Sequence, residues 1–369
     1  FDLVSEMKDA ISLGVGEPDF DTPWRIREEG IYTLEKGKTY YTSNSGLMDL
    51  RIEISRYLER RFGLNYDAEK EIIVTVGGSE GIDLAFRAML NPGDEVIIPE
   101  PCYVSYVPCV TLADGVPVTV NLKEENDFKL TKEQLLSAIT PRTKILVLAF
   151  PNNPTGAVMT KEELEEIAEV VKEKDIFVVS DEIYAELSYG NTRHCSIASI
   201  DGMKERTIVI NGFSKAHAMT GWRLGYACGP EVIIKQMLKI HQFAIMCAPT
   251  NSQYAAVEAL RECDDAVEEM RNEYDRRRRF MLSKLRGMGL KVFEPYGAFY
   301  IIPNIAEFGL TSDEFATRFL TEEKVAVVPG TAFGDCGEGF LRMSYASSLS
   351  NLKTAMERLE KFIDRLRNK

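Results

Sequence analysis

The sequence predicts an α/β protein built around a mostly parallel sheet, with a smaller α+β unit beside it. Short β-branched runs alternate with helical patterns along most of the chain, which is typical of βαβ units. The runs are apolar at nearly every position, so they predict strands that are buried on both faces. A length of 369 residues is enough for one large domain and one smaller one.

The strands of the large domain are predicted from five β-branched runs. These are Glu71–Val76, Asp94–Ile98, Lys144–Phe150, Ile176–Ser180 and Thr207–Asn211. Segments with helical spacing lie between several of them, for example Ser79–Leu90 and Lys161–Lys174.

A long charged segment with helical periodicity, Asp264–Met288, is expected to lead out of the large domain. Its run 276–279 of four arginines is interpreted as a solvated helix face rather than a nucleic-acid patch. The strands predicted beyond it belong to the smaller unit and are Val292–Phe293, Ala298–Ile302, Val325–Val328 and Phe340–Ser344. We therefore expect a large domain over residues 26–268 and a small domain formed by residues 1–25 and 269–369.

The composition argues against several classes of function. A net charge of −13 disfavours nucleic acid and anionic membranes as partners, and no apolar run approaches the length of a membrane span. The seven cysteines are scattered, odd in number and without a Cys-x-x-Cys pair, which predicts neither a zinc framework nor a disulfide scaffold. Three dispersed histidines are too few for a metal centre. With no recognisable signal peptide, the chain is expected in the reducing cytoplasm.

Ligands of an open parallel sheet bind at the carboxyl ends of its strands, so the residues after each predicted strand are candidates for a site. Gly77, Gly78 and Ser79 follow the first strand, where glycines allow close approach and a helix start offers free N–H groups to a phosphate. The alternative is a plain turn with a serine N-cap. Tyr103 follows the second strand and could stack on a flat heterocycle, although core packing is the better interpretation for any single aromatic residue.

Polar residues follow the next two strands. Asn153 lies in the rigid loop Pro151–Gly156 and could donate a hydrogen bond to a ligand oxygen, or serve only as part of a turn. Asp181 ends a buried strand, where an unpaired carboxylate is costly. Pairing with a protonated ring nitrogen and capping of a following helix are equally good interpretations of this aspartate. Tyr184, about one helical turn further on, is expected to face the same side.

Three cations complete the candidate site. Lys215 follows the fifth strand, and a lysine amine is the usual side chain for a Schiff base with a carbonyl compound or with pyridoxal phosphate. Arg223 lies shortly after it and would attract an anion. Arg342 lies within an apolar strand, where it requires a bidentate carboxylate or an internal salt bridge. The combined inventory of strand ends matches what pyridoxal phosphate and an amino acid require.

The chain closely resembles the class I/II pyridoxal-phosphate aminotransferases of fold type I over nearly its whole length. The matching motifs occur in the family's order, and Ser214–Gly225 is among its most specific signatures. The others are Gly16–Phe20, Tyr41–Arg51, Gly77–Ser79, Pro151–Gly156, Asp181–Tyr184, Gly297–Tyr300 and Arg342. The resemblance implies a seven-stranded sheet sandwiched by helices, pyridoxal phosphate as the cofactor, and a homodimer.

The resemblance also assigns roles around the cofactor ring. Lys215 would form the Schiff base, and Asp181 would keep the pyridine nitrogen protonated. Tyr184 and Asn153 would hydrogen-bond the phenolic oxygen, and Tyr103 would stack on the ring.

At the phosphate, the resemblance assigns Gly78, Ser79 and Arg223, together with Tyr41 contributed by the partner subunit of a homodimer. Many relatives also carry a serine three residues before the lysine that contacts the phosphate. This chain has Gly212 at that position, and Ser214 is not assigned the contact.

The substrate site implied by the resemblance has three components. Arg342 would clamp the α-carboxylate, the loop at Gly16 would close over the substrate, and Asn153 would lie beside both.

The predicted reaction transfers the amino group of an L-amino acid to a 2-oxo acid such as 2-oxoglutarate, with Lys215 moving a proton as general base. No cation stands out near the presumed side-chain pocket, which could be lined by Phe20, Trp24, Tyr40 and Tyr106, although any of these four residues could instead belong to the core. Aromatic or other neutral amino acids are therefore the expected donors. The rivals are an N-acyl-diaminopimelate or alanine/aspartate aminotransferase and a carbon–sulfur β-lyase of the same fold. A non-catalytic regulator would need a DNA-binding segment, for which the acidic chain has no spare length.

Overall fold

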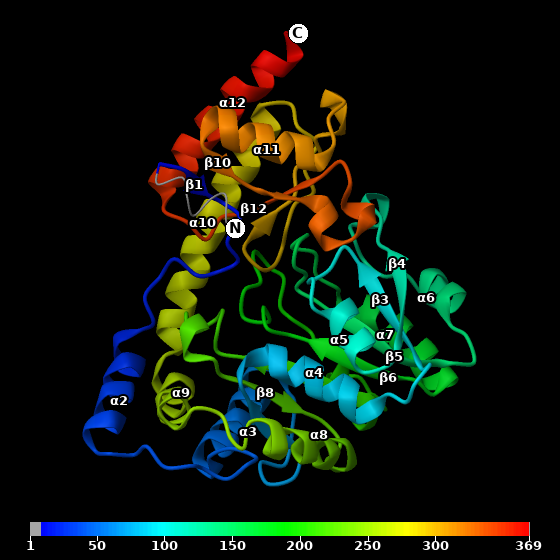
Figure 1. Ribbon diagram of the computed structural model, residues 1–369, viewed down its shortest axis with the longest axis vertical. Coiled ribbons are helices and arrows are strands. Elements are labelled where there is room, and N and C mark those ends of the chain that lie inside the picture. Colours follow the sequence, from blue (N-terminus) through cyan, green and yellow to red (C-terminus); the bar gives the residue numbers. More distant parts are fainter. Residues whose placement is uncertain (1–8, 369) are drawn as a thin grey trace.

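The computed structural model describes residues 9–368 and divides visibly into two bodies (Figure 1). The lower body in Figure 1 contains a seven-stranded sheet with helices on both sides, and the upper body contains short strands and the C-terminal helices. The long helix α10 (Asp264–Gly287) runs from one body to the other. The predicted α/β fold with a seven-stranded, mostly parallel sheet is thereby confirmed. The domain boundaries at residues 26 and 268 remain a prediction.

The seven strands of the large sheet lie in the order β2-β8-β7-β6-β5-β3-β4. All pairs are parallel except those that involve β8, which runs antiparallel to β2 and β7. The strands are β2 (Ile72–Thr75), β3 (Glu95–Glu100), β4 (Val116–Asn121), β5 (Thr143–Ala149), β6 (Phe177–Asp181), β7 (Thr207–Gly212) and β8 (Gly225–Cys228).

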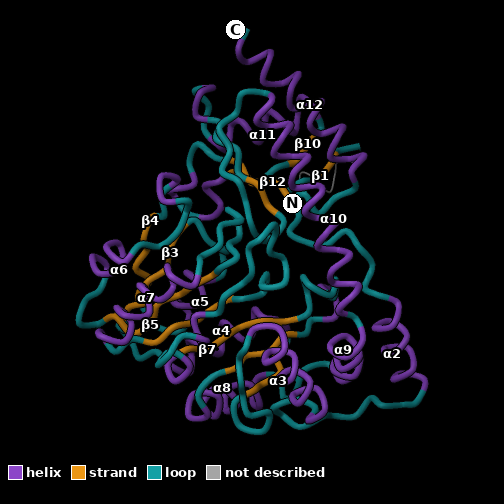
Figure 2. Tube along the Cα trace, turned by 180° about the vertical axis from the view of Figure 1, so that it is seen from behind, coloured by secondary structure: helices purple, strands orange, loops and turns teal. Residues whose placement is uncertain are grey.

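Ten further α-helices cover the sheet and fill the upper body, as the view from behind also shows (Figure 2). They are α2 (Trp24–Glu35), α3 (Met48–Phe62), α4 (Gly77–Met89), α5 (Tyr106–Leu112), α6 (Lys132–Ala138), α7 (Lys161–Lys174), α8 (Glu231–Ala244), α9 (Thr250–Glu262), α11 (Ser312–Glu323) and α12 (Leu349–Arg367).

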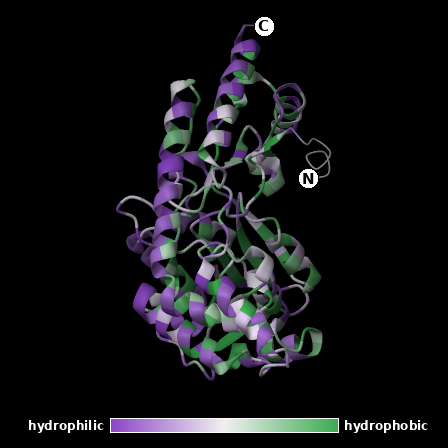
Figure 3. Cartoon of the chain, turned by 90° about the vertical axis from the view of Figure 1, so that its left-hand side faces the viewer, coloured by the Kyte–Doolittle hydropathy of each residue, from purple (hydrophilic) through white to green (hydrophobic). Residues whose placement is uncertain are grey.

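Both faces of the large sheet are buried, because alternate residues of each strand enter different cores. In β5, Ile145 and Val147 pack on the side of α4, α5 and α8. Leu146 and Leu148 pack on the side of α7. Strands with apolar side chains on both faces explain the uninterrupted apolar runs of the sequence. Figure 3 shows the resulting green, hydrophobic strands enclosed by helices whose outer faces are purple.

The upper body is built from two small sheets. One pairs β1 (Ile11–Ser12) with β10 (Val325–Ala326), so the N-terminal segment packs against the C-terminal part of the chain. The other has the order β11-β12-β9, formed by β11 (Val328–Pro329), β12 (Leu341–Ser344) and β9 (Tyr300–Ile301). No helix within residues 9–368 is both long enough and apolar enough to span a membrane.

Two strands of the large sheet are absent from the sequence prediction. β4 is one of the two edge strands and is partly exposed, so it lacks the apolar run that marks the interior strands. β8 has only four residues and begins at a glycine, which weakens any strand signal.

The interpretation of the arginine run as a solvated face is wrong for two of its four residues. Arg277 and Arg278 are buried, whereas Arg276 and Arg279 are exposed. The two buried side chains are paired with carboxylates on their own helix and on other segments, which offsets the cost of burying their charge.

Candidate active site

The predicted site residues gather at one edge of the large sheet. β2, β3, β5, β6 and β7 all point the same way, so their carboxyl ends open on the same side. Register places Asp181, the last residue of β6, opposite Ala149 of β5 and Ile210 of β7. The polar residues that follow these strands are therefore brought together by the topology alone.

Lys215 lies in the turn after β7, with its amine directed into this edge. Its Nζ donates to the carbonyl of Gly16 at 2.5 Å and lies near the rings of Tyr184 and Phe299. Burial lowers the pKa of the amine to about 8. That value already includes the Glu17 and Asp181 carboxylates, which raise the pKa, and the nearby Arg342 and Arg223, which lower it. A buried amine that is half protonated at about pH 8 is suited to nucleophilic and base chemistry.

Asp181 is buried and held by two hydrogen bonds. Tyr106 donates its hydroxyl proton to Oδ2 at 2.7 Å, and the Ile183 N–H donates to Oδ1 at 3.2 Å. Burial raises the pKa of the carboxyl group, and the bond from Tyr106 opposes that rise. A turn rather than a helix follows β6, so the helix-capping interpretation is not what places this aspartate.

Tyr106 takes the core-packing alternative rather than lining an apolar substrate pocket. The residue is fully buried and its hydroxyl is used by Asp181. Of the other three candidates for that pocket, Phe20 lines a cleft beside the loop of Arg223. Phe20 packs edge-on against Tyr274, while Trp24 and Tyr40 are exposed at the surface.

Arg342, in β12, reaches the same edge from the small body. Its Nη1 donates to Oδ1 of Asn153 at 2.9 Å, and its Nη2 donates to the carbonyl of Gly14 at 2.5 Å. Its Nε is buried and has no hydrogen-bond partner within residues 9–368, and no described carboxylate pairs with the side chain. The salt-bridge alternative therefore fails, and a buried guanidinium is left with capacity for an external anion.

Asn153 keeps a donor free near Arg342, and the Tyr184 hydroxyl pairs with a second tyrosine. The Asn153 oxygen is occupied by Arg342, so its amide NH₂ remains to donate. The Tyr184 hydroxyl lies 2.7 Å from the hydroxyl of Tyr300, and either of the two can be the donor. Tyr300 is a residue that sequence reasoning noted only within a motif.

The first turn of α4 and Arg223 form a positive corner of the site. The helix begins at Gly77, so the N–H groups of its first turn have no partner within the helix. Glu80 accepts from the Val76 N–H at 2.5 Å and contacts His241, which fixes the start of the helix. A Cβ placed on Gly77 would lie 2.7 Å from Nη2 of Arg223. Arg223 itself has a positive φ of 50°, a strained conformation of the kind that clusters at functional sites.

The N-terminal segment 14–22 covers this edge of the sheet. The carbonyls of Gly16 and Gly14 accept hydrogen bonds from Lys215 and Arg342. Asp19 accepts two further hydrogen bonds from Arg277, at 2.8 and 2.9 Å. Thr22 donates to the carbonyl of Ala218 at 2.5 Å. These contacts tie the segment that contains Gly16 to both bodies.

The remaining predicted residues lie at the margin of the site. Tyr103 is half-buried and packs edge-on against Tyr106, with the ring centres 5.7 Å apart. Gly78 and Ser79 belong to the first turn of α4. Tyr41 is 78% exposed, so its side chain makes no use of the site of its own chain.

Gly212 is explained by the approach of two strands. A Cβ at this position would lie 3.0 Å from the Cα of Gly225 in β8 and 3.1 Å from the carbonyl oxygen of Leu224. A serine there would push β7 and β8 apart.

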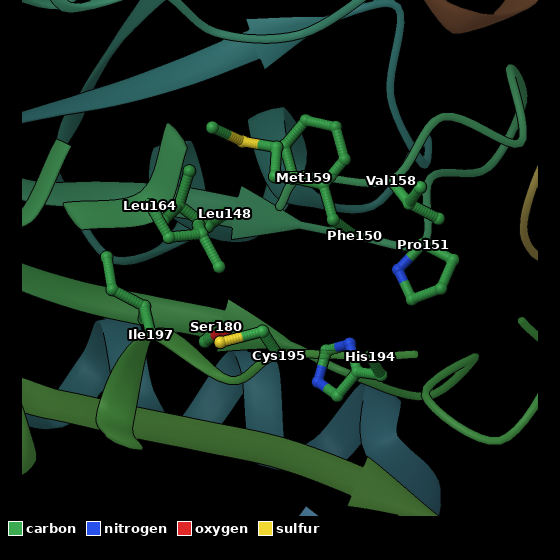
Figure 4. Close-up of a pocket in the computed structure, with 10 residues that line it drawn as sticks. All are labelled: Leu148, Phe150, Pro151, Val158, Met159, Leu164, Ser180, His194, Cys195 and Ile197. Carbon is green, nitrogen blue, oxygen red and sulfur yellow. The ribbon is translucent and has the colours of Figure 1, made fainter. Parts of the chain in front are cut away.

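A cleft and a small cavity lie near these residues. The cleft, of about 610 Å³, extends between the N-terminal segment and the loop of Arg223, with Glu17, Phe20, Thr220 and Asn251 among its lining residues. The cavity, of about 20 Å³, is closed and has room for a single water molecule. Figure 4 shows the residues that line it, among them Pro151, Ser180, His194 and Cys195.

Known proteins resemble this chain over almost its full length. The family model for aminotransferase class I and II matches residues 8–359. An aspartate aminotransferase of Pyrococcus abyssi is 49% identical over 365 residues, which are 98% of this chain and 94% of that protein. Aromatic-amino-acid aminotransferase 2 of Thermococcus litoralis is 46% identical over 365 residues, with the same coverage.

Solved structures agree with the sequence comparisons. The crystal structure of an aromatic aminotransferase from Pyrococcus horikoshii OT3 superposes with a TM-score of 0.96 at 48% identity and covers 99% of each chain. A match of both sequence and fold over the whole chain, at this identity, goes beyond a shared architecture. The chain belongs to the aminotransferase class I and II family, a family of enzymes that generally depend on pyridoxal phosphate.

Proposed function

We propose that this protein binds pyridoxal phosphate at the described edge of the sheet and transfers an amino group from an L-amino acid to a 2-oxo acid such as 2-oxoglutarate. The observation that carries the proposal is Lys215, a buried amine with its pKa lowered to about 8 between Asp181, Arg223 and Arg342. These groups supply one nucleophile, one carboxylate and two anion sites in a single place. That combination is what the cofactor and an amino acid need.

The donor set fits the cofactor. Asp181 is a buried carboxylate with lone pairs left for a cationic N–H, as a protonated pyridine nitrogen offers. The positive corner of Gly78, Ser79 and Arg223 suits a phosphate, because helix N–H groups, dipole and guanidinium all favour a negative charge. The Asn153 amide and the Tyr184 hydroxyl suit the phenolic oxygen, and Tyr103 would cover the ring face.

When bound, pyridoxal phosphate supplies an aldehyde that accepts an amino group and a ring that withdraws electrons from the carbon bearing that group. The chain supplies the proton chemistry. Above about pH 8 the Lys215 amine is largely neutral, so it can take a proton from the substrate carbon and hold it. Asp181 stays ionised by pairing with a positive charge, which offsets its burial.

The substrate carboxylate is assigned to Arg342, whose buried Nε lacks a partner among the described residues. The carbonyl of Gly14 accepts a hydrogen bond from Arg342, and the carbonyl of Gly16 accepts one from Lys215. The substrate would replace these carbonyls, so the N-terminal segment that carries them would move as the substrate enters. Glu17 is the acidic residue next to Lys215, and its charge disfavours a second carboxylate at that point. Aromatic or other neutral amino acids are therefore the proposed donors.

We further propose a cytoplasmic homodimer in which Tyr41 of the partner subunit completes the phosphate site. The exposure of Tyr41 in its own chain supports this arrangement. The seven cysteines are all unpaired, which supports a reducing compartment.

The experiment is a half-reaction screen on purified protein loaded with pyridoxal phosphate. Each amino acid is added without an acceptor, and the change in the visible absorption is followed. We expect the fastest change with aromatic or neutral amino acids, and no visible, borohydride-reducible chromophore in Lys215→Ala, which also loses nearly all turnover. Near wild-type turnover in Lys215→Ala would contradict the proposal.

The same screen separates the rival functions. A carbon–sulfur β-lyase would release pyruvate and ammonia from cystathionine without any 2-oxo acid acceptor. An aspartate or diaminopimelate enzyme would respond fastest to those donors, which would overturn the proposed substrate class while leaving the reaction in place.

A further inference from the structure

Tyr300, the first residue of β9, contacts three residues of the site. Its hydroxyl lies 2.7 Å from the hydroxyl of Tyr184. Its ring centre lies 4.3 Å from the guanidinium carbon of Arg342. A Cβ on Gly16 would collide with its hydroxyl, so the covering segment lies directly against it.

The direction of the bond between the two tyrosines follows from the proton count. A tyrosine hydroxyl has one proton, so only one of two facing hydroxyls donates to the other. If Tyr184 gives its proton to the phenolic oxygen of the cofactor, the bond must run from Tyr300 to Tyr184. Among the described residues, Tyr184 is also the only hydrogen-bond partner of the Tyr300 hydroxyl. Hydrogen bonds in series polarise one another, so Tyr184 becomes the stronger donor.

The ring of Tyr300 makes a separate contact. Arg342 lies over both Tyr300 and Phe333, at 4.3 and 4.7 Å from their ring centres. Within residues 9–368 this buried cation has no carboxylate partner. Aromatic faces therefore stabilise it before an anion arrives and fix the plane of its guanidinium group. The edge of that plane is what a carboxylate binds.

We propose that Tyr300 is a positioning residue with two separable functions. Its hydroxyl donates to Tyr184 and strengthens Tyr184 as a donor, and its ring orients Arg342 toward the substrate carboxylate. The proposal rests on the roles of Tyr184 and Arg342 in the function proposed above.

The test uses the full-length protein loaded with pyridoxal phosphate and three variants. Tyr300→Phe removes only the hydroxyl, Tyr300→Leu also removes the ring, and Tyr345→Phe is the matched control. Tyr345 is equally buried in the same core, and its hydroxyl donates to the carbonyl of Ala298 at 3.3 Å, away from the site. The readouts are the pH midpoint of the visible absorption and the affinity for an unreactive carboxylic acid. Two acids, 3-phenylpropanoate and succinate, are first compared on the wild-type protein, and the one that binds more tightly is used for all variants.

The hydroxyl function predicts a rise in the pH midpoint of Tyr300→Phe. A hydrogen bond to the phenolic oxygen stabilises the high-pH form, which carries more charge on that oxygen, so a weaker bond raises the midpoint. The rise should be about half a pH unit or more, with the affinity for the acid within about twofold of wild type. Tyr345→Phe should shift neither readout.

The ring function predicts that Tyr300→Leu shows the same rise and also binds the acid about fivefold or more weakly. If Tyr300→Leu does not fold, Tyr300→Met, which lacks an aromatic face but retains bulk, takes its place. An unchanged midpoint in Tyr300→Phe overturns the hydroxyl function, and equal acid affinity in the Phe and Leu or Met variants overturns the ring function. A wild-type protein with no visible absorption after addition of pyridoxal phosphate would instead contradict the proposed function.

Discussion

Lys215 shows how the fold changes the chemistry of one side chain. Burial alone makes the charged amine less favourable, and the cations Arg342 and Arg223 act in the same direction. Asp181 and Glu17 oppose the shift, but the net pKa falls from 10.5 to about 8. The protein thus keeps a reactive amine where an ordinary lysine would be almost fully protonated.

The reactivity of Lys215 should therefore follow pH with a midpoint near 8 in the cofactor-free protein. The neutral amine is the reactive form, so labelling by an amine-directed reagent rises as the pH increases through about 8 and then levels off. Mass spectrometry of the labelled digest measures this site by site, with the exposed lysines of the same sample as reference. A midpoint of Lys215 at or above that of the exposed lysines would contradict the lowering of its pKa by burial.

At the scale of single elements, the start of α4 is the most demanding point of the site. Gly77 has a φ of +71°, and a side chain there would meet the Arg223 guanidinium. Gly63, at the end of α3, has a nearly identical φ of +68° but has open space around the added Cβ. The two glycines share a backbone requirement and differ only in their surroundings.

Replacing each glycine by alanine should separate strain from binding. Both Gly77→Ala and Gly63→Ala are expected to lose about 1–2 kcal/mol of unfolding free energy from the left-handed conformation. Only Gly77→Ala should also weaken binding of pyridoxal phosphate, by about tenfold or more, because Arg223 is displaced from the phosphate corner. Thermal unfolding and titration of the cofactor-free protein measure the two effects. Equal cofactor affinity in both variants would argue against a phosphate at this helix start.

At the scale of the whole molecule, an apolar surface surrounds Tyr41. Tyr40 and Phe243 are 82% and 87% exposed, and the two segments that carry them are joined by the bond from Asn44 to Gln242. Exposed aromatic residues gathered in this way are typical of a protein interface. The surface supports a homodimer in which each Tyr41 reaches the other subunit.

Phe243→Asp should therefore convert the dimer into monomers and reduce activity in proportion. Sedimentation velocity gives the mass, and turnover is measured at the same concentrations. Leu136→Asp is the matched control, because Leu136 is also exposed but lies on α6, on the far side of the sheet. A fully active Phe243→Asp monomer would contradict the contribution of Tyr41 from a partner.

Much of the fold could be predicted from the sequence because it depends on local patterns. Apolar runs identified β2, β3, β5, β6 and β7, since strands buried on both faces are apolar at most positions. The edge strand β4 and the short β8 could not be predicted, because their stability comes from neighbours rather than from their own composition.

The sequence by itself determined which chemistry is present: a lysine, an aspartate, an arginine and a glycine-rich helix start at or after the ends of predicted strands, and a second arginine within a strand. Only the tertiary structure decided how these groups are held. In the folded chain, Tyr106 donates a hydrogen bond to Asp181, and the Gly16 carbonyl accepts one from Lys215. Tyr300 shares a hydrogen bond with Tyr184 and stacks its ring against Arg342. Such contacts join residues far apart in the chain, so no local pattern encodes them. They exist because parallel strands bring their carboxyl ends to one edge and the small body closes over it.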